Sequence, residues 1–333
     1  MSECMRKLRR EEQQAAQALW LDAFPEDADG FCAFYFAHEY PQDTYYGLFD
    51  NGRLCSMIGV AQVQIYLNGQ TVPMPLLRGV ATYAHLQGRG YAGRLLAYVL
   101  RELRSQGYGA AMLKTFIHGF YEKHGFAVCS YRTRRTLQAA VGNGEIAIYR
   151  NMCEIDDRLT DGLLATYTAY CRDKQLFLQR ERRHIRRALT MALDVYGGVL
   201  AVYMKDGVPD GYLIGYMDSD GTLQSDEAVP GSGGESVFAE IAAKLGCDRV
   251  AYKAFGSGGE ADAMIRVLDV QRWFRYRPQD STFAFAVQDP LFPENCGDWQ
   301  FGQPDNKQIT ILTPGQAATL TVDADKAGIY EEY

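Results

Sequence analysis

The 333-residue chain lacks several features that would define its class at once. No apolar run is long enough to cross a bilayer, and the opening MSECMRKLRREEQQ is charged, with no apolar stretch behind it. We therefore expect neither a transmembrane segment nor a secretory signal. The eight cysteines are scattered, without a Cys-x-x-Cys motif or a nearby pair of histidines. This pattern favours reduced thiols in a cytoplasmic protein and argues against a disulfide framework or a metal site.

An excess of positive charge is also missing. The chain carries 34 Lys and Arg against 41 Asp and Glu, which gives a formal net charge of -7. Nucleic acid and an anionic membrane are therefore not expected as main partners. The acidity is compatible with a cationic substrate, and equally with simple solubility. The length predicts two or three domains.

Two familiar phosphate-binding loops are not found. The glycine clusters at residues 231–234 and 256–259 are not followed by Gly-Lys-Ser/Thr, so neither is a phosphate loop of the Walker type. A dinucleotide-binding unit is disfavoured at the glycine-rich stretch near residue 88, because no acidic residue closes a following strand at the expected distance.

What the sequence does contain is a regular order of elements. The first 140 residues predict two helices, three strands, a helix, a strand, a helical turn and a last strand. In that order the elements are residues 8–24, 30–39, 45–49, 54–66, 76–82, 92–106, 110–114, 120–125 and 127–137. The triplet Asp50-Asn-Gly52 lies between two of the strands and predicts a hairpin turn.

A second segment repeats this order weakly. It predicts a helix, basic turns, two strands, a helix and a strand at residues 157–173, 180–187, 198–204, 211–217, 234–245 and 248–254. Its second helix follows strands much as residues 92–106 do, which hints at an internal duplication. Residues 277–333 are rich in strand signals, including STFAFAV, NKQITIL and AATLTV. We therefore predict a mixed α/β chain with three domains, at residues 1–140, 141–275 and 276–333.

The stretch VATYAHLQGRGYAGRLL, residues 80–96, carries the clearest chemical signal. It places three glycines and two arginines between a predicted strand and the start of a predicted helix. Glycine lets the backbone approach a ligand closely, and a helix start offers N–H groups and the positive end of the helix dipole. The bend is therefore either a site for a diphosphate or a turn that uses glycine for geometry alone.

Two motifs carry a resemblance to a known family. Gln87-Gly-Arg-Gly-Tyr-Ala92 resembles the Gln/Arg-x-x-Gly-x-Gly/Ala signature of the GCN5-related N-acetyltransferases (GNAT superfamily). Phe120-Tyr-Glu-Lys-His-Gly-Phe126 resembles the family's later FYEKxGF element, in the right order and at a suitable distance. The layout is similar to that of the enhanced intracellular survival (Eis-like) subgroup. The resemblance implies an acetyltransferase domain, a degenerate second copy and an abbreviated sterol-carrier-like domain, with a mixed, mostly antiparallel central sheet flanked by helices.

The resemblance also assigns roles to residues. It implies acetyl-CoA as the co-substrate, with the strand Val80-Ala81-Thr82 beside the pantetheine arm. The backbone N–H groups of the bend would hold the pyrophosphate; these are Gln87, Gly88, Arg89, Gly90, Tyr91 and Ala92. Tyr121 would be the general acid toward the CoA thiolate, because a phenol with a pKa of about 10 is protonated at neutral pH. The alternative is that Tyr121 is a packed tyrosine whose hydroxyl is satisfied elsewhere.

The acceptor is expected to be a small cationic amine, such as a polyamine-like or aminoglycoside-like molecule. In Eis-like enzymes the C-terminal carboxylate is the base, here Tyr333, and a solvated tail is the alternative. Glu26, Asp27 and Glu39 of the first domain are alternative acids, and they adjoin aromatic residues. With Phe24 and Phe36 they are predicted to line the acceptor pocket; the alternative is that the aromatic residues are simply core. Two rival functions stay open, a non-catalytic acyl-CoA or lipid carrier and a transferase of longer acyl chains. The subgroup's hexamers imply a homo-oligomer.

Overall fold

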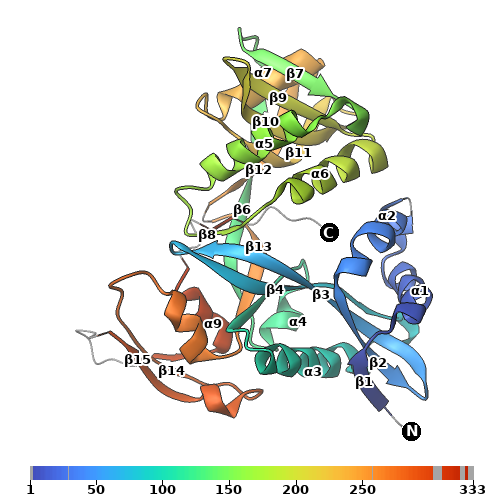
Figure 1. Cartoon of the computed structure of the whole chain (residues 1–333), viewed down its shortest axis with the longest axis vertical. Coiled ribbons are helices and arrows are strands. Elements are labelled where there is room, and N and C mark those ends of the chain that lie inside the picture. The colour runs from blue at the N-terminus through green and yellow to red at the C-terminus, as the bar shows by residue number, and fades with distance from the viewer. Residues whose placement is uncertain (1–2, 29, 257, 303–309, 323–326, 329–333) are drawn as a thin grey trace.

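The computed structural model describes residues 3–28, 30–256, 258–302, 310–322 and 327–328, and it is drawn in Figure 1. The first 140 residues form the lower right of the molecule. Their elements are β1 (Glu3–Lys7), α1 (Gln13–Ala23), α2 (Phe31–His38), β2 (Thr44–Asp50), β3 (Arg53–Leu67), β4 (Gln70–Thr82), α3 (Tyr91–Ser105), β5 (Ala110–Lys114), α4 (His118–Glu122) and β6 (Ala127–Gln138). Every element predicted for this segment is confirmed, and β1 is an additional strand. The predicted hairpin turn is confirmed as well, since Asn51 and Gly52 take the positive φ values of 50° and 78° that such a turn needs.

Most of the middle of the chain lies in the upper part of Figure 1, while β8 and β13 reach down to the strands of the first segment. Its elements are β7 (Glu145–Tyr149), α5 (Asp157–Tyr170), β8 (Leu176–Leu178), α6 (Arg182–Thr190), β9 (Val199–Lys205), β10 (Val208–Met217), β11 (Thr222–Val229), α7 (Ser236–Leu245), β12 (Arg249–Phe255) and β13 (Glu260–Val267). The basic turns predicted at residues 180–187 are wrong, because most of this stretch is the helix α6. Ile185 and Leu189, four residues apart, are buried on one face of that helix while its arginines line the other.

The last segment contains α8 (Val270–Trp273), β14 (Phe283–Val287), β15 (Gly297–Phe301), β16 (Thr310–Leu312), α9 (Pro314–Thr319) and β17 (Ala327–Gly328). The strand predicted from AATLTV is wrong, because these residues end the helix α9. Thr313 caps that helix by accepting a hydrogen bond from the N–H of Gln316, and Pro314 occupies its first position.

One large mixed sheet of fourteen strands joins most of the described residues. Its order is β1-β2-β3-β4-β5-β13-β6-β12-β11-β10-β9-β7, with β8 beside β3 and β17 beside β8. The two ends of the sheet correspond to each other. Counted inward from one end, the strands are β1, β2, β3, β4 and β5; counted inward from the other end, they are β7, β9, β10, β11 and β12. The match extends to direction, because β4 and β5 are parallel and so are β11 and β12. At the centre β13 and β6 exchange places, so each half of the sheet is completed by a strand from the other half of the chain (Figure 1).

A separate sheet of three strands, β15-β14-β16, lies at the lower left of Figure 1. Its inner side is filled by aromatic rings, with Phe274 and Phe301 stacked at a centroid distance of 4.5 Å and Phe285 4.9 Å from Phe274. The predicted mixed α/β fold is thus confirmed at the level of a large mixed sheet and a small separate one. The division into three domains stays a prediction. Across the described part of the chain, every helix falls short of the length and apolar character that a bilayer span needs.

Candidate active site

The candidate site begins where two parallel strands separate. β4 and β5 pair at Leu76–Met112 and Leu77–Leu113, and β4 then continues to Thr82 along β3. The register of β3 and β4 shifts between Met57 and Gly59, which is a β-bulge, and a bulge bends the strand that contains it. Beyond Leu77, β4 pairs among the described residues with β3 alone, so its other edge over residues 79–82 is not paired with β5; the place where the two strands diverge is called the opening below.

Glycine is required at the bulge. Gly79 has φ +56°, and a Cβ at this position would lie 2.5 Å from the ring of Trp20. The other edge of β4 is secured by Ser56, whose hydroxyl donates to the carbonyl of Ala81 at 2.8 Å and also bonds the hydroxyl of Thr82. Val80, Ala81 and Thr82 therefore lie on one fixed strand edge beside the opening.

The glycine bend follows this strand directly. Gly88 and Gly90 have φ values of +77° and +76°, and Gly90 is the N-cap of α3. The first N–H groups of a helix have no partner within the helix, so the bend offers donors to an anion. Gln87, Arg89 and the two glycines are exposed, while Tyr91 is buried under the helix start. Of the two arginines, Arg94 is already engaged, since it donates to the carbonyl of Arg89 at 3.0 Å and pairs with Glu3 at 2.8 Å.

The backbone conformation of Gly90 gives a first testable prediction. If the bend binds the pyrophosphate of acetyl-CoA, as the resemblance implies, Gly90→Val should raise the KM for acetyl-CoA by about tenfold, because a branched side chain at φ +76° strains or rebuilds the bend. Gly207→Val is the matched control, since Gly207 has φ +74° in the turn between β9 and β10 of the other half. Equal KM values for the two variants in a steady-state assay would contradict the role of the bend.

Tyr121 lies in α4, beyond the end of β5. Its side chain is 7% exposed and packs edge-to-face against Phe120 at 4.9 Å and Phe126 at 5.8 Å. Burial raises the pKa of Tyr121 to about 12, so the phenol is protonated at neutral pH. Among the described residues its hydroxyl has no hydrogen-bond partner. A protonated hydroxyl without a competing acceptor is suited to donate a proton.

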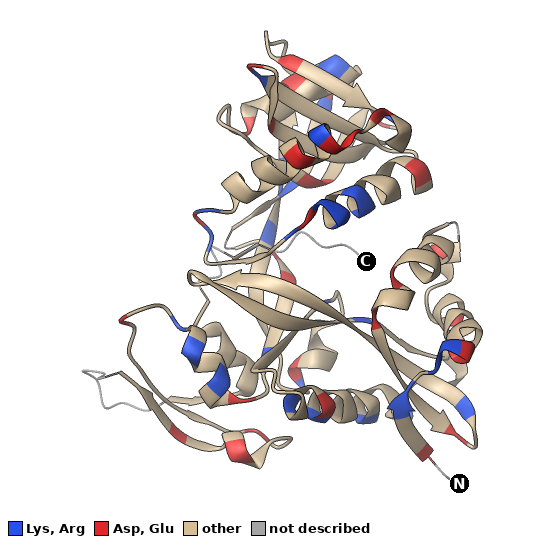
Figure 2. Ribbon diagram, viewed as in Figure 1, with Lys and Arg blue, Asp and Glu red and all other residues tan. Residues whose placement is uncertain are grey.

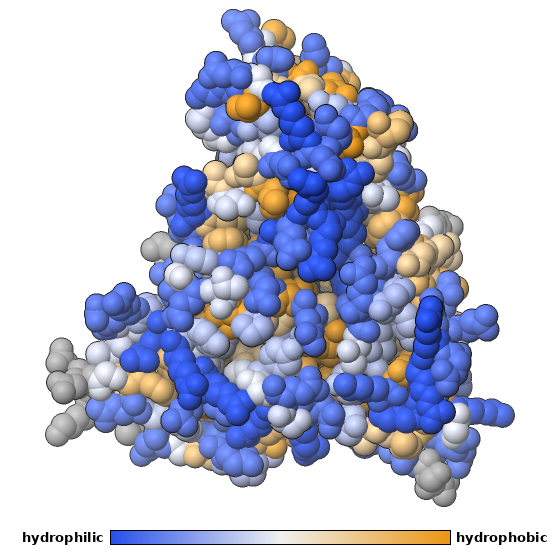
Figure 3. Space-filling view, in the orientation of Figure 1, coloured by the Kyte–Doolittle hydropathy of each residue, from blue (hydrophilic) through white to orange (hydrophobic). Residues whose placement is uncertain are grey.

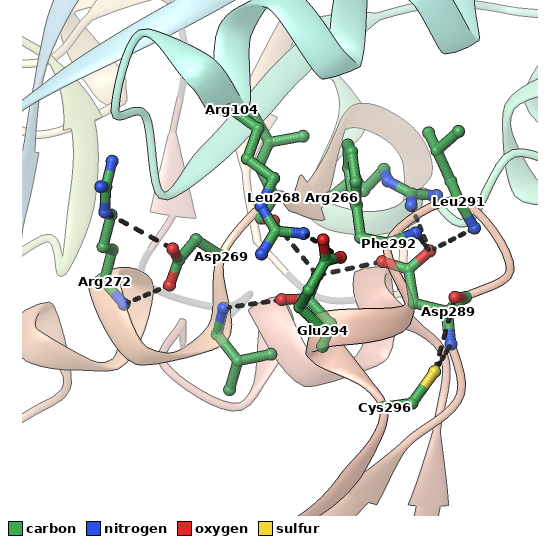
Figure 4. Close-up of polar contacts among 12 residues, drawn as sticks. Arg104, Arg266, Leu268, Asp269, Arg272, Asp289, Leu291, Phe292, Glu294 and Cys296 are labelled. Carbon is green, nitrogen blue, oxygen red and sulfur yellow. Dashed lines mark hydrogen bonds and ion pairs between the residues drawn. The ribbon is translucent and has the colours of Figure 1, made fainter.

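The turn after Tyr121 is held by residues that lie far along the chain, and Figure 4 shows the Arg266–Asp289 part of this contact. Arg266 on β13 donates to the carbonyl of His124 and forms an ion pair with Asp289 at 2.6 Å. Asp289 is itself fully buried and accepts from the N–H groups of Leu291 and Phe292 at 3.0 Å and 3.2 Å. The segment after β14 therefore supports the α4 turn, a contact that the sequence pattern did not indicate.

Three of the five predicted acceptor residues gather around Trp20. The indole N–H of Trp20 donates to Asp27 at 2.7 Å, and its rings lie 5.3 Å from Phe24 and 5.8 Å from Phe36. Burial raises the pKa of Asp27, and the bond from Trp20 opposes that rise. Glu26 is exposed at the edge of this group. Because the ring of Trp20 packs against Gly79, the cluster around Trp20 contacts β4 at its bulge.

Glu39, the remaining acceptor candidate, is buried in an ion-pair network. It accepts from Arg78 of β4 at 3.1 Å and from Arg187 of α6 at 2.8 Å. Arg78 also pairs with Asp43 at 2.6 Å. The network joins α2, β4 and the second half of the chain. A lone arginine in the apolar run LLRGVAT could have indicated Arg78, whereas no sequence signal pointed to Arg187. Tyr333, predicted as the base, lies outside the described residues.

The matching place in the other half of the sheet is closed. There β11 and β12 pair over four residues, Thr222–Ser225 against Arg249–Tyr252. A Cβ on Gly231, in the loop before α7, would lie 1.2 Å from the carbonyl oxygen of Asp210, and the N–H of Ser232 donates to the Asp210 carboxylate at 3.2 Å. A carboxylate at this loop would repel a phosphate. The first half alone combines an open strand edge with a donor-lined bend in the described structure.

Comparison with known proteins defines the class of the first half. Residues 4–129 match the family model described as an acetyltransferase (GNAT) domain. The match covers this segment alone, and it identifies residues 4–129 as similar to an acetyltransferase (GNAT) domain. No curated protein sequence matches the chain. Gly88, Gly90 and Gly93 also have the Gly-x-Gly-x-x-Gly spacing of a dinucleotide-binding loop. Glycine spacing alone therefore does not distinguish a dinucleotide-binding loop from an acetyltransferase bend.

Solved structures resemble the fold of nearly the whole chain. A conserved protein of unknown function from Enterococcus faecalis V583, described as a probable N-acyltransferase, matches 90% of this chain and 82% of its own, with 19% identity and a TM-score of 0.73. A GCN5-related N-acetyltransferase from Kribbella flavida matches 95% and 88%, with 17% identity and a TM-score of 0.68. Eis1 from Mycobacterium abscessus matches 96% and 89%, with 16% identity and a TM-score of 0.71. At these identities the likeness concerns the fold.

Proposed function

We propose that the chain transfers an acetyl group from acetyl-CoA to a primary amine of a small cationic molecule, by direct attack in a ternary complex. The proposal is supported by the divergence of β4 from β5, by the glycine bend that follows β4, and by Tyr121, which belongs to the same hydrophobic cluster as Leu77 and Leu113. An exposed β edge, free N–H donors and a protonated phenol are the groups that a CoA thioester requires.

The reaction is assigned to these groups as follows. The backbone of Val80 and Thr82 pairs with the pantetheine arm as an added strand, and residues 87–92 bind the pyrophosphate. The neutral amine attacks the thioester carbon, and a main-chain N–H stabilises the oxyanion. The C–S bond then breaks, the thiolate takes the proton of Tyr121, and the new amide nitrogen has lost its proton to a base.

The base remains a choice among acids. The C-terminal carboxylate of Tyr333 stays a prediction from the resemblance. Of the acids in the first domain, Glu39 already neutralises two arginines, and Glu26 is exposed. Asp27 is half-buried, and its pKa is raised by burial, which makes its carboxylate the stronger base. These properties favour Asp27 over Glu39.

The pH dependence tests Asp27. A base must be unprotonated to act, and the raised pKa keeps Asp27 protonated up to a higher pH. As the pH is lowered, kcat/KM should therefore begin to fall at a higher pH than it would with an aspartate of ordinary pKa. Asp27→Asn should remove this acid limb, while its side-chain oxygen still accepts from Trp20. Glu26→Gln removes the neighbouring exposed carboxylate and serves as the control. An unchanged acid limb in Asp27→Asn excludes Asp27 and leaves the terminal carboxylate.

The second half supports a tandem arrangement. Its strand order and its parallel pair β11·β12 match those of the first half, and its closed loop at Gly231 is what a degenerate copy without CoA would contain. We assign residues 276–333 to a small sterol-carrier-like domain on the resemblance alone. The cytoplasmic location, the homo-oligomer and the absence of nucleic-acid and membrane partners stay predictions.

The alternative is an acyl-CoA or lipid carrier without catalysis. The stacked rings of Phe274, Phe285 and Phe301 occupy the inner side of the small sheet, which disfavours a lipid cavity there. A thermal-shift titration separates the two functions: acetyl-CoA at millimolar concentration should raise the unfolding temperature, and Gly90→Val should reduce the rise. A rise with phospholipid or fatty acid, and none with acetyl-CoA, would support the carrier.

A further inference from the structure

A large cavity lies in the second half of the chain, and its lining contains no residue of the glycine bend or of the strand Val80–Thr82. It has a volume of about 710 Å³ and lies between α6, the π-helical turn after it (Met191–Val195), and the ends of β10 and β11. Its volume is within the range of cavities that hold small organic ligands. Figure 2 shows the arginines of α6 as a blue band on this helix, and Figure 3 shows hydrophilic side chains over it with hydrophobic ones beside them.

The walls of the cavity are mostly apolar. Ala188 and Ala192 line it four residues apart on one face of the helical segment, and Met191 and Ile214 contribute to the same lining. Both alanines are half-buried, and their small side chains leave the space beside the helix unfilled. An apolar wall with few polar groups favours an organic ligand over a hydrated ion.

The polar part of the lining contains a buried ion pair between Arg180 and Glu227. Arg180, whose side chain is 5% exposed, forms a bidentate pair with Glu227 at 2.6 Å and 3.0 Å. The hydroxyl of Tyr212 donates to the same carboxylate at 2.7 Å. Asp226, the other acid of the lining, pairs with Lys253 at 2.6 Å. Both acidic groups are therefore already neutralised, and an ammonium ligand would find no carboxylate that is not already paired with a cation.

The rim carries exposed aromatic and sulfur side chains together with a cation. Tyr196, Tyr216 and Met217 are 59%, 52% and 45% exposed, and all three line the cavity. Large exposed apolar side chains gathered at a cavity mouth mark a binding surface. Arg150 lies at the same mouth and is exposed; among the described residues its guanidinium forms no ion pair within 4.0 Å, although its charge helps to lower the pKa of Glu154. The rim thus offers rings for a flat apolar body and a guanidinium for an acidic group.

We propose that this cavity binds an amphipathic carboxylate, with its apolar or aromatic body against Ala188, Met191 and Ile214 and its carboxylate on Arg150. Arg187 and Met191 of the lining also contact the first half, through Glu39 and the cluster around Trp20, but no residue of the glycine bend or of Val80–Thr82 lines the cavity. The proposal does not rest on the acetyltransferase function. It takes a ligand of the charge opposite to that of the amine acceptor.

The test uses calorimetric titration of the full chain with three probes of one shape: 4-biphenylcarboxylate, 4-biphenylmethanol and 4-biphenylmethylamine. The carboxylate should bind at least about fivefold tighter than the alcohol or the amine, since an exposed ion pair adds a modest amount to apolar binding. Saturating acetyl-CoA should leave this binding unchanged. Equal binding of the three probes, or loss of carboxylate binding with acetyl-CoA, would overturn the proposal.

Variants locate the site. Ala188→Trp should weaken carboxylate binding by about tenfold or more, because the indole fills the cavity. Arg150→Gln should weaken it about threefold, and Arg158→Gln, the same change on the exposed start of α5, should not. If Ala188→Trp fails to fold, Ala192→Leu fills the same space with a smaller side chain. Unchanged binding in a folded cavity-filling variant would also overturn the proposal.

Discussion

Tyr121→Phe is expected to lower kcat for acetyl transfer by about 100-fold or more, with little change in the KM for acetyl-CoA. The CoA thiolate leaves as an anion, and removing the phenol proton leaves the thiolate without its acid. The substitution deletes one oxygen from a side chain that is packed by Phe120 and Phe126. Because this hydroxyl has no hydrogen-bond partner among the described residues, the fold should lose less than about 1 kcal/mol.

Steady-state kinetics and thermal unfolding of Tyr121→Phe check both parts. Tyr98→Phe is the control, because Tyr98 is a half-buried tyrosine on α3 that packs against Tyr46 at 6.1 Å. An unchanged kcat in Tyr121→Phe would mean that Tyr121 is a packing residue. The pKa near 12 adds a second expectation: between pH 7 and 10 the wild-type kcat should show no decline from ionisation of this phenol.

Asp289→Ala is expected to produce the largest loss of stability. The substitution removes the partner of Arg266 at a place where both side chains are buried, with exposed fractions of 0% and 3%. An unpaired buried charge costs about 3–5 kcal/mol, so chemical denaturation should show a loss of that size. Asp289 also holds the N–H groups of Leu291 and Phe292, which would lose their acceptor.

Glu294→Ala is the matched control in the same turn (Figure 4). Glu294 pairs with Arg104 at 3.0 Å, but its side chain is 70% exposed. An exposed pair contributes about 0–1 kcal/mol, so this variant should unfold close to the wild type. Equal losses in the two variants would show that the Asp289–Arg266 pair does not anchor the last segment. Because Arg266 also bonds the carbonyl of His124, Asp289→Ala should lower kcat even where the protein is folded.

The sequence predicted the local parts of the site and missed the distant ones. The glycine bend, the helix after it and the α4 turn depend on neighbouring residues, and their patterns were readable. β13 lies between β5 and β6, more than 120 residues away from either along the chain, and no local pattern encodes that pairing. The strand AATLTV was predicted from β-forming residues, but the cap at Thr313 and Pro314 made part of it a helix.

Long-range ion pairs show the same limit. Glu39 and Arg187 are 148 residues apart and meet because α6 lies against the first half. Before the structure, Glu39 was an acid beside aromatic residues and therefore an acceptor candidate. Its partners show that its charge is used to join the two halves. The Trp20 cluster, by contrast, gathers residues that are close in sequence, and it brings together Phe24, Asp27 and Phe36 as the sequence suggested.

The most direct test of the account is release of free CoA thiol when the purified chain is mixed with acetyl-CoA and a panel of amines. We predict release that requires an amine, is fastest with a small polycationic amine such as spermidine or an aminoglycoside, and is abolished to within a few per cent in Tyr121→Phe. Mass spectrometry should find the acetylated amine. Binding of acetyl-CoA without thiol release for any amine of the panel would contradict catalysis and support a carrier.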